Sequence, residues 1–553
     1  LMGHAASLAF GDGARIAAGD VALAAADALA FGRAASILGR DDIALTAGSM
    51  SFGDEASLSA GQKMTLVTTG GDARFGVSAV LAGTTVGFDT AGALHFGRSA
   101  LLNASGELQA TAGGDLLFGD SAAIAAGSIG FAVNGDVLFG RSGVVDAAER
   151  IDIASRNLAL GDAVRVDGGS GVALIAADRI AGSTQVTLQS GSALTLRARQ
   201  IGFGDTLAAG AADAISFGAS HALTLGNAAT LTASTLALDA GSVELGSDAT
   251  LRAADALAIR ADGSLALADR FTMASAGGDI VLSADDLALA DAGVVDAARA
   301  VRLTGTARLR GGDSLRLRAS ELVANGGTVT FGEALDMRAG GLLALTAADG
   351  AMAIGGNAVL NSSGDIELAA TGGLTTGQRL ALASTGGARI DAAWVEVGSD
   401  TRFTAQWLAL TASAGGLALG EASTLDARDL MTLSAAGDLA IGAQTVLAAN
   451  AIGIHAGDNA SIGTTVAIAG RDTVTLDAAD ALTIGSEVEI AAGDALRVAA
   501  ADVAIGDLAR LSGGTELDIA ARSGNLTAAG ARLAGAAVAL RAQGAVALDH
   551  SSV

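Results

Sequence analysis

The feature that most constrains this chain is a large apolar residue, followed by a glycine or another small residue, that recurs at nearly constant intervals. The phrase AFGD at residues 9–12 returns as AFGR at 30–33. The intervals cluster at 20 to 23 residues, or at twice that spacing, almost to the end of the chain. A fixed period in this range is typical of a solenoid, in which each repeat is one turn stacked on the next. The series comprises Phe10, Phe31, Phe52, Phe75, Phe96, Phe118, Phe139, Leu160, Phe203, Leu225, Leu245, Leu267, Leu289, Phe331, Ile354, Val397, Leu419, Ile441, Ile462, Ile484 and Ile505.

Within one period the pattern is that of strands. Between residues 8 and 23, apolar residues alternate with small or polar ones in three short segments, which Gly-Asp pairs separate. Helical spacing fits poorly, and each glycine would cost a helix roughly 1 kcal/mol. The sequence therefore predicts an all-β fold, a right-handed three-sided parallel β-helix (β-solenoid) of about 25 coils of roughly 21–22 residues. The period predicts one continuous domain over residues 1–553.

Stacking turns would bring equivalent residues together, because parallel strands lie about 4.8 Å apart. We therefore expect an internal ladder of offset rings, each contact contributing about 0.5–1.5 kcal/mol beyond burial. The glycine after each ring is expected to turn the corner with a positive φ, which a β-branched residue could not adopt. The rings of this ladder are Phe10, Phe31, Phe52, Phe75, Phe96, Phe118 and Phe139.

The residue after that glycine alternates between acid and base in successive turns, except at Val77, which is uncharged. Opposite charges on neighbouring turns should attract, so each charged residue is expected to pair with both of its neighbours, although exposed pairs contribute only about 0.2–1 kcal/mol each. A strand that slipped by a whole turn would bring like charges together, so the alternation predicts a device that fixes register. The alternative is a pattern that arose by chance. The ladder comprises Asp12, Arg33, Asp54, Arg98, Asp120, Arg141 and Asp162.

Composition excludes several classes of function. A net charge of −25 argues against nucleic acid as a partner, since such a protein needs a basic face. The absence of cysteine removes disulfides, thiolate metal sites and cysteine nucleophiles. The longest uncharged run, residues 121–135, is too short to span a bilayer, which takes about 20 apolar residues. The chain starts at Leu1 inside a repeat with no signal peptide, so we expect a segment of a longer polypeptide.

Motifs for catalysis or metal binding are weak. The five histidines are scattered, and the sequence Gly-Ala-Ser-His-Ala at 218–222 lacks the final glycine of a nucleophile elbow. Gly-Gly-Asp triplets, such as 113–115, do not recur in tandem as a calcium-binding β-roll would require. We therefore expect no enzyme and no cofactor, with calcium unsupported by a motif.

Two groups of residues could bind a partner. Arginines crowd into residues 299–318 and alternate with apolar residues, which predicts that they line one outer face. That face could dock an anionic glycan or the acidic corners of a neighbouring rod, or it could be a solvated face balanced by nearby acids. Two tryptophans that precede inward residues are expected to be partly exposed, and outward aromatic residues often mark contacts. The candidates are Arg302, Arg308, Arg310, Arg316, Arg318, Trp394 and Trp407.

The stretch LDARDLMTLSAAGDLAIGAQTVLAANAIGIHAGD, residues 425–458, spaces short apolar triplets by Ala-Gly-Asp and Asn-Ala turns. This pattern covers most of the chain and resembles the repeat shafts of filamentous-haemagglutinin-like exoproteins, large bacterial surface proteins exported by two-partner secretion. The resemblance implies an extracellular β-helical shaft that holds an adhesive or toxic tip away from the cell. It also implies an outer-membrane transporter as the export partner.

Three hypotheses follow. The first is a structural extracellular rod without catalysis, either an adhesin shaft or the body of a filament that self-associates. The second is a β-helix that binds polysaccharide or another surface through the arginines of 299–318. The third is a β-helical glycan lyase or hydrolase, which the even turn lengths disfavour because they leave no room for long loops.

Overall fold

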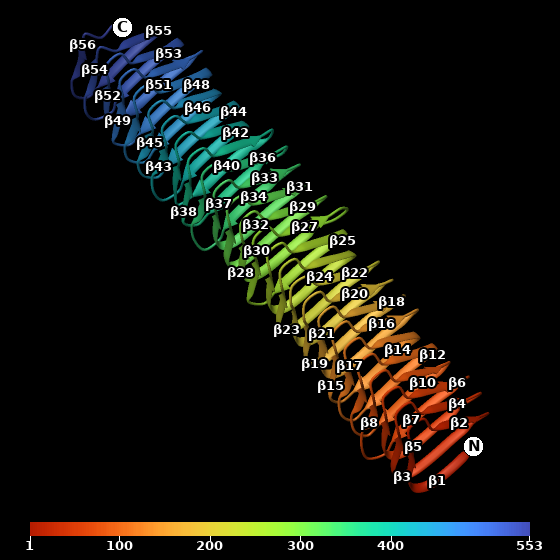
Figure 1. Ribbon diagram of the computed structural model, residues 1–553. Helices are drawn as coiled ribbons and strands as arrows, with labels where there is room; N and C mark the ends of the chain where they lie inside the picture. The colour runs from red at the N-terminus through yellow and green to blue at the C-terminus, as the bar shows by residue number, and fades with distance from the viewer. The chain divides into compact units, whose positions relative to one another are not determined.

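The computed structural model describes residues 1–553 and contains 56 strands and no helix. No element could therefore cross a bilayer as a helix. The chain divides into two compact units, Leu1–Ala276 and Gly277–Val553. Within each unit the strands pair in parallel, turn upon turn (Figure 1). The all-β parallel solenoid predicted from the sequence is confirmed.

Each turn is built from three strand segments, which stack into three parallel sheets. In an early turn the segments are β2 (Arg15–Ala18) and the two halves of β3 (Val21–Phe31), between which the register shifts. β2 pairs with β4 (Ser36–Gly39), and the two halves of β3 pair with β5 (Ile43–Phe52). We call the sheet of β2 sheet 1, that of the first half of β3 sheet 2, and that of its second half sheet 3.

The corner between sheet 3 and sheet 1 holds a residue with positive φ in every turn. There are 24 such non-glycine residues and two such glycines, 26 in all, spaced 20 to 23 residues apart with φ between 51° and 65°. Thirteen lie in each unit, so the chain has about 26 turns, against about 25 predicted. A left-handed conformation costs an L-residue roughly 1–2 kcal/mol. Hydrogen bonds between turns offset this cost: the Ala34 N–H donates to the Asp54 carbonyl at 2.8 Å, and the Glu55 N–H to the Val77 carbonyl at 2.8 Å.

The prediction that the glycine after each ring has positive φ is wrong. Among the glycines only Gly13 and Gly530 have it, and the left-handed residue comes two positions after the ring's glycine. The glycine is needed because adjacent turns approach closely at this corner. A Cβ on Gly32 would lie 2.6 Å from the backbone nitrogen of Asp12 in the preceding turn, where no side chain fits.

The core of the first seven turns is a column of phenylalanines in sheet 3. Neighbouring ring centroids are 4.6 to 5.1 Å apart, and the ring planes lie within 10° of parallel. Phe88 from sheet 2 adds edge-on contacts to two of these rings. The column comprises Phe10, Phe31, Phe52, Phe75, Phe96, Phe118 and Phe139, the residues of the predicted ladder.

Two of the doubled intervals in the repeat series have a steric cause. Gly182 occupies the rung between Leu160 and Phe203, and its missing side chain leaves room for the phenylalanine ring. A Cβ on Gly182 would lie 2.5 Å from Phe203 Cε1. Gly311 plays the same part below Phe331, with 2.8 Å to Cε1. The period therefore continues through both positions with glycine in place of a large residue.

The charged corner residues of Asp12 to Asp162 act mainly through the backbone. Asp12 Oδ1 accepts a hydrogen bond from the Arg33 N–H at 2.7 Å, and Asp120 Oδ1 accepts one from the Arg141 N–H at 2.9 Å. Between side chains of the predicted ladder, the only ion pair joins Arg141 Nε to Asp162 Oδ2 at 3.4 Å. The expectation that each charge pairs with both neighbours is therefore wrong, because the short Asp side chain reaches the next turn's N–H instead. The guanidinium of Arg33 turns to Glu55 Oε1 at 2.7 Å, which raises the Arg33 pKa.

A second corner, between sheets 2 and 3, uses the same device. Asp72 Oδ1 accepts from the Ala93 N–H at 2.9 Å, and Asp115 Oδ1 accepts from the Asp136 N–H at 2.9 Å. The backbone bond from Ala93, followed by the bond from Arg74, holds the pKa of the Asp72 carboxyl below its usual range. Carboxylates at the corners thus join one turn to the next in the ionised state.

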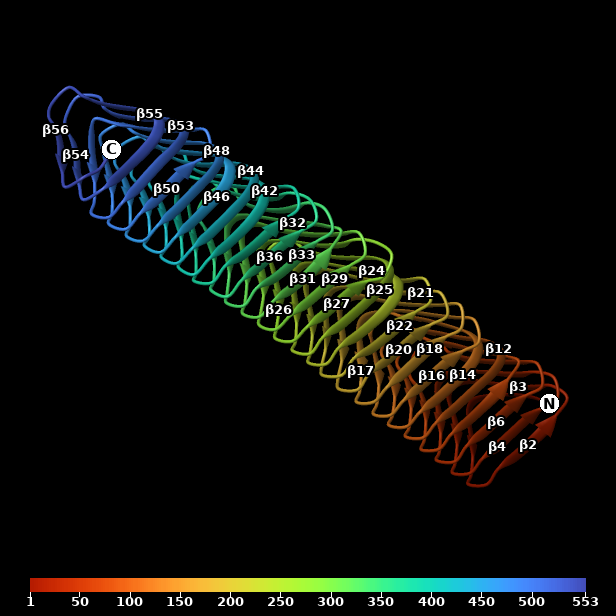
Figure 2. The same ribbon diagram turned by 90° about the horizontal axis from the view of Figure 1, so that it is seen from above.

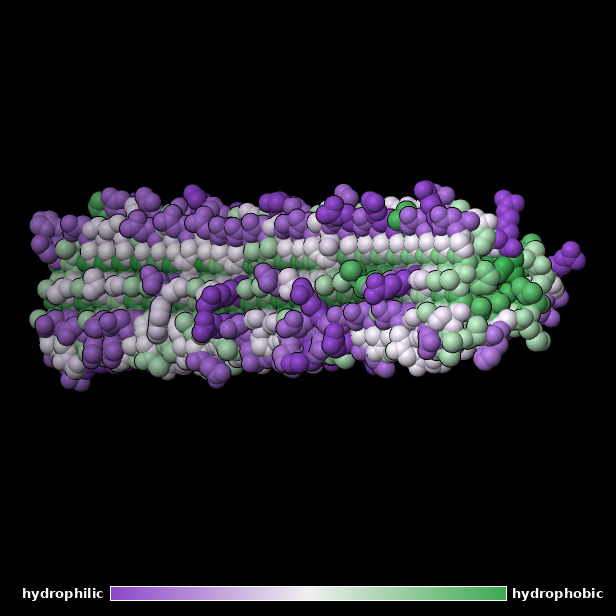
Figure 3. Space-filling model, turned by 60° about the horizontal axis from the view of Figure 1, so that its bottom comes forward, coloured by the Kyte–Doolittle hydropathy of each residue, from purple (hydrophilic) through white to green (hydrophobic).

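Surface residues follow the same stacking. In Figure 3 residues of like hydropathy line up in rows, and Figure 2 shows the corners of neighbouring turns in line. Along each strand, buried and exposed residues alternate, because successive side chains point to opposite faces. Each outward position of a turn therefore belongs to a row along the stacking direction.

Candidate functional site

The arginines of residues 299–318 do not share one face. Arg302 lies on sheet 2, in the first half of β30 (Ala300–Gly311), whereas Arg308 and Arg310 lie on sheet 3 in its second half. Arg316 and Arg318 lie on sheet 1, in β31 (Arg316–Ala319). The predicted single face is wrong because the stretch spans nearly a whole turn. Alternation places its arginines outward on all three sheets in succession.

Two of the five candidate arginines, Arg302 and Arg308, are paired with acids. Arg302 contacts Asp279 Oδ2 at 3.1 Å and Glu321 Oε2 at 3.4 Å, and Arg308 Nε lies 3.6 Å from Asp286 Oδ1. Exposed pairs of this kind contribute about 0–1 kcal/mol each. These contacts favour the alternative that the sequence left open, a solvated surface balanced by acids.

Both tryptophans pack against a glycine of the preceding turn. Trp394 begins β41 (Trp394–Val397) on sheet 3 and is 42% exposed, and Trp407 lies at the start of the sheet 2 segment of its turn and is 38% exposed. Gly373 stands beneath Trp394, and a Cβ there would lie 2.6 Å from Cδ2 of the indole. A Cβ on Gly387 would likewise collide with the indole of Trp407. Each indole thus packs on the backbone of the preceding turn and remains partly exposed.

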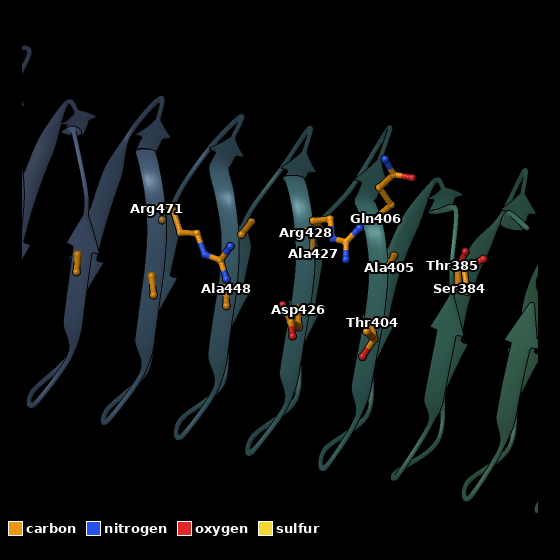
Figure 4. A pocket seen from close by; sticks show the side chains of 14 residues that line it. Ser384, Thr385, Thr404, Ala405, Gln406, Asp426, Ala427, Arg428, Ala448 and Arg471 are labelled. Atoms are coloured by element: carbon orange, nitrogen blue, oxygen red, sulfur yellow. The ribbon is translucent and has the colours of Figure 1, made fainter. Parts of the chain in front are cut away.

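A groove runs across successive turns of the second unit where sheet 1 meets sheet 2. It has a volume of about 670 Å³ and extends from Ser384 to Ala491 (Figure 4). It crosses β39 (Ala381–Ser384), β42 (Arg402–Ala412), β44 (Thr424–Ala435), β46 (Val446–Ala456), β48 (Ala467–Ala478) and β50 (Glu489–Ala492).

The floor of the groove consists of small residues, and its polar groups come from the same rows. One outward row of sheet 1 contributes Thr404, Asp426 and then three alanines at 448, 469 and 491. The corner that follows contributes Gln406, Arg428 and Arg471, all exposed. The methyl groups at 448, 469 and 491 leave the later turns open, because no long side chain fills that row.

The two groove arginines extend over the floor toward the preceding turn. In Figure 4, Arg428 reaches toward the strand that carries Ala405, and Arg471 reaches toward Ala448. Neither guanidinium forms an ion pair within the chain, whereas Asp429, next to Arg428, accepts a hydrogen bond from Gln406 Nε2 at 3.1 Å. The two guanidiniums therefore remain available to a ligand.

Sequence reasoning missed this groove. A signal was present, since Ala-Arg-Asp at 427–429 and Gly-Arg-Asp at 470–472 occupy the same corner two turns apart. Trp407 was a candidate, and it directly follows Gln406 of the lining. The structure places the five candidate arginines of residues 302–318 elsewhere.

Other chemistry-bearing residues form no larger cluster. Ser220 Oγ lies 3.2 Å from His221 Nδ1, and Arg199 Nη2 lies 3.4 Å from His221 Nε2. This exposed pair lies within a strand, β23 (Ala214–Leu225), and lacks the strand-to-helix turn of a nucleophile elbow. No three His, Asp or Glu side chains converge as metal ligands would.

Comparison with known proteins gave no family model, no curated protein and no solved structure that matches this chain.

Proposed function

We propose that residues 1–553 form one continuous structural rod, which serves as an extracellular shaft or as the body of a filament. The observation that supports this proposal best is the constancy of the turn: the left-handed corner returns every 20 to 23 residues in both units. A chain that repeats one turn about 26 times adds length with each repeat. A mechanical role fits this constant turn length better than a catalytic role does, because no turn carries an inserted loop.

Contacts between turns give such a rod its stability. Every turn adds backbone bonds in three sheets, one left-handed corner and core contacts to its neighbours, as the column of phenylalanines illustrates. Stability in such arrays is approximately a sum over repeats and their interfaces. Corner carboxylates such as Asp12 and Asp72 add a bond from one turn to the next.

The resemblance to filamentous-haemagglutinin-like shafts supports a place at the bacterial cell surface and export through an outer-membrane transporter. The absence of cysteine is compatible with an exported protein that needs no covalent crosslink. The net charge of −25 favours solubility and opposes close side-by-side association, so we propose solitary shafts or end-to-end filaments rather than bundles. Antibody labelling of intact cells would test the location independently of the rod itself.

Small-angle scattering tests the rod. About 26 turns at roughly 4.8 Å each predict a maximum dimension of about 120 Å. Deleting residues 164–206 joins the left-handed corner of Ala163 to Leu207, removes two whole turns in register, and should shorten the particle by about 10 Å. Deleting residues 164–196 instead breaks the register at the junction and should destabilise the turns on either side of it. A particle of about half the expected length, or no shortening in the in-register deletion, would contradict the proposal.

A further inference from the structure

We propose that the groove of the second unit binds an extended acidic polysaccharide, whose chain lies along the direction in which the turns stack. This inference goes beyond the structural role, because it assigns a ligand to a defined surface. The residues that carry it are Arg428, Arg471, Asp426, Gln406 and Trp407.

The shape of the groove favours a linear ligand. From Ser384 to Ala491 it crosses five intervals between turns, a length of roughly 24 Å at about 4.8 Å per turn. Its floor carries alanine methyl groups, and no large apolar side chain is among the lining residues. A floor of small residues flanked by polar groups suits a chain of sugar rings better than an amphipathic helix, which needs an apolar groove.

The charges of the groove favour carboxylates on that chain. Arg428 and Arg471 stand at equivalent corners two turns apart, a spacing of about 10 Å. A guanidinium pairs with a carboxylate through two parallel hydrogen bonds, and neither arginine has such a partner within the chain. The regular spacing matches a polymer whose charged rings recur along its length. Asp426, on the turn of Arg428, and Gln406, one turn before it, supply an acceptor and an amide for sugar hydroxyls.

The overall negative charge of the protein does not prevent this binding. At physiological ionic strength the Debye length is about 8 Å, so acids elsewhere on the surface are largely screened from a ligand in contact with the arginines. The same screening predicts that binding weakens as salt is added. The acids nearest to the two arginines in sequence are Asp426 of the lining, Asp429 and Asp472, and Asp429 accepts a hydrogen bond from the Gln406 amide.

Two exposed apolar side chains stand on sheet 2, beside two of the turns that the groove crosses. Trp407 stacks in register with Leu430 of the next turn, and these side chains are 38% and 48% exposed. The indole packs on Gly387 of the preceding turn, where a Cβ would collide with it, and the residue remains partly exposed. The C–H groups on one face of a sugar ring pack against the electron-rich face of such an aromatic ring. Trp407 thus provides a platform at the end of the groove where Gln406 lies.

Calorimetric titration with defined oligomers tests the proposal. We expect the full chain to bind polygalacturonate oligomers, and R428Q and R471Q each to weaken binding roughly tenfold, as for a lost hydrogen bond to a charged group. R310Q is the matched control, since Arg310 is exposed and lies outside the groove on sheet 3. Far-UV circular dichroism checks that each variant is folded. Equal binding of a neutral glucan, or equal affinity of R428Q, R471Q and R310Q, would overturn the proposal.

The two tryptophans allow a second test by fluorescence. Only Trp394 and Trp407 emit, so the W394F variant reports on Trp407 alone and the W407F variant reports on Trp394 alone. We expect oligomer to shift or quench the emission of W394F and to leave that of W407F unchanged. A response confined to Trp394 would place the ligand elsewhere and refute the assignment. Failure of both tests would leave the rod untouched, because scattering measures it independently.

Discussion

Gly182 makes room for the ring of Phe203. The G182A substitution adds only one methyl group, but we expect it to destabilise the fold more than so small a change normally does. The new Cβ would lie 2.5 Å from Phe203 Cε1, whereas real Cβ contacts closer than 3.0 Å essentially do not occur. Phe203 is 4% exposed, so its ring cannot swing into solvent. Overpacking of this kind costs about 1–3 kcal/mol. Alanine also lowers the conformational entropy of the unfolded chain, which stabilises the fold by about 0.4–1 kcal/mol. The net decrease in the free energy of unfolding is therefore about 1–2 kcal/mol.

A neighbouring glycine provides the matched control. Gly202 precedes Phe203 in the same strand, faces outward, and has nothing within 4 Å of the position of a Cβ. The G202A variant should therefore be neutral or stabilised by up to about 1 kcal/mol. The two variants make the same chemical change within sheet 3, so their difference isolates the clash.

A double variant identifies the ring as the cause. F203L places at this rung the residue type that the next turn carries at Leu225, and it should cost about 1–2 kcal/mol alone. In the G182A/F203L variant the clash disappears, so the two losses should fall short of additivity by about 1 kcal/mol or more. Urea unfolding followed by circular dichroism gives the free energy of unfolding of the unaltered protein, G182A, F203L and G182A/F203L. Hydrogen exchange over residues 160–203 shows where the structure is destabilised. Strict additivity, or equal effects of G182A and G202A, would refute this explanation of the doubled interval.

Three further predictions concern the core and the corners. F96L should lose about 1–3 kcal/mol, since Phe96 contacts three other rings, and urea unfolding should show a larger loss than for F10L, which has one ring neighbour. The pKa of Asp72 lies below its ordinary value of 3.8 in the folded state, so its ionised form stabilises the fold above that pH, and the contribution is lost as pH falls through the folded pKa. Urea midpoints of D72N should therefore fall less between pH 5 and pH 2 than those of the unaltered protein. L508N should raise the free energy of unfolding by a few tenths of a kcal/mol. Leu508 is exposed and has a φ of 60°, a conformation that asparagine tolerates better than leucine does. An unchanged or lower melting temperature would contradict this prediction.

Some features of the structure could be predicted from the sequence, and others could not. The ring residues from Phe10 to Phe139 could be identified because burial, size and spacing are all visible in a repeat. The role of the glycine at the corner could not, because a sequence shows that a side chain is absent and not which atoms fill the space. The same holds for the arginines of 299–318: alternation shows that they point outward, but not that the chain turns two corners within the stretch.

The groove was harder to predict from the sequence than the core was. Arg428 and Arg471 are 43 residues apart and unremarkable individually, and they meet one surface only because two whole turns separate them. Trp407 stood out as an exposed aromatic residue, but its support by Gly387 depends on register between turns. Corner carboxylates such as Asp12 were noticed for their charge, and the structure shows that their main partner is a backbone N–H.

The sequence by itself determined the class of fold, the length of the turn and the residues of the core, because a period of alternating apolar residues has only one way to bury them all. Tertiary structure alone decided which surface residues are neighbours, which corner position takes the left-handed conformation, and where an open groove remains. The physical reason is that a solenoid converts separation along the chain into position around and along the stack. The number of residues differs slightly from one turn to the next, and these differences decide which side chains share a row. They cannot be recognised from the types of residue alone.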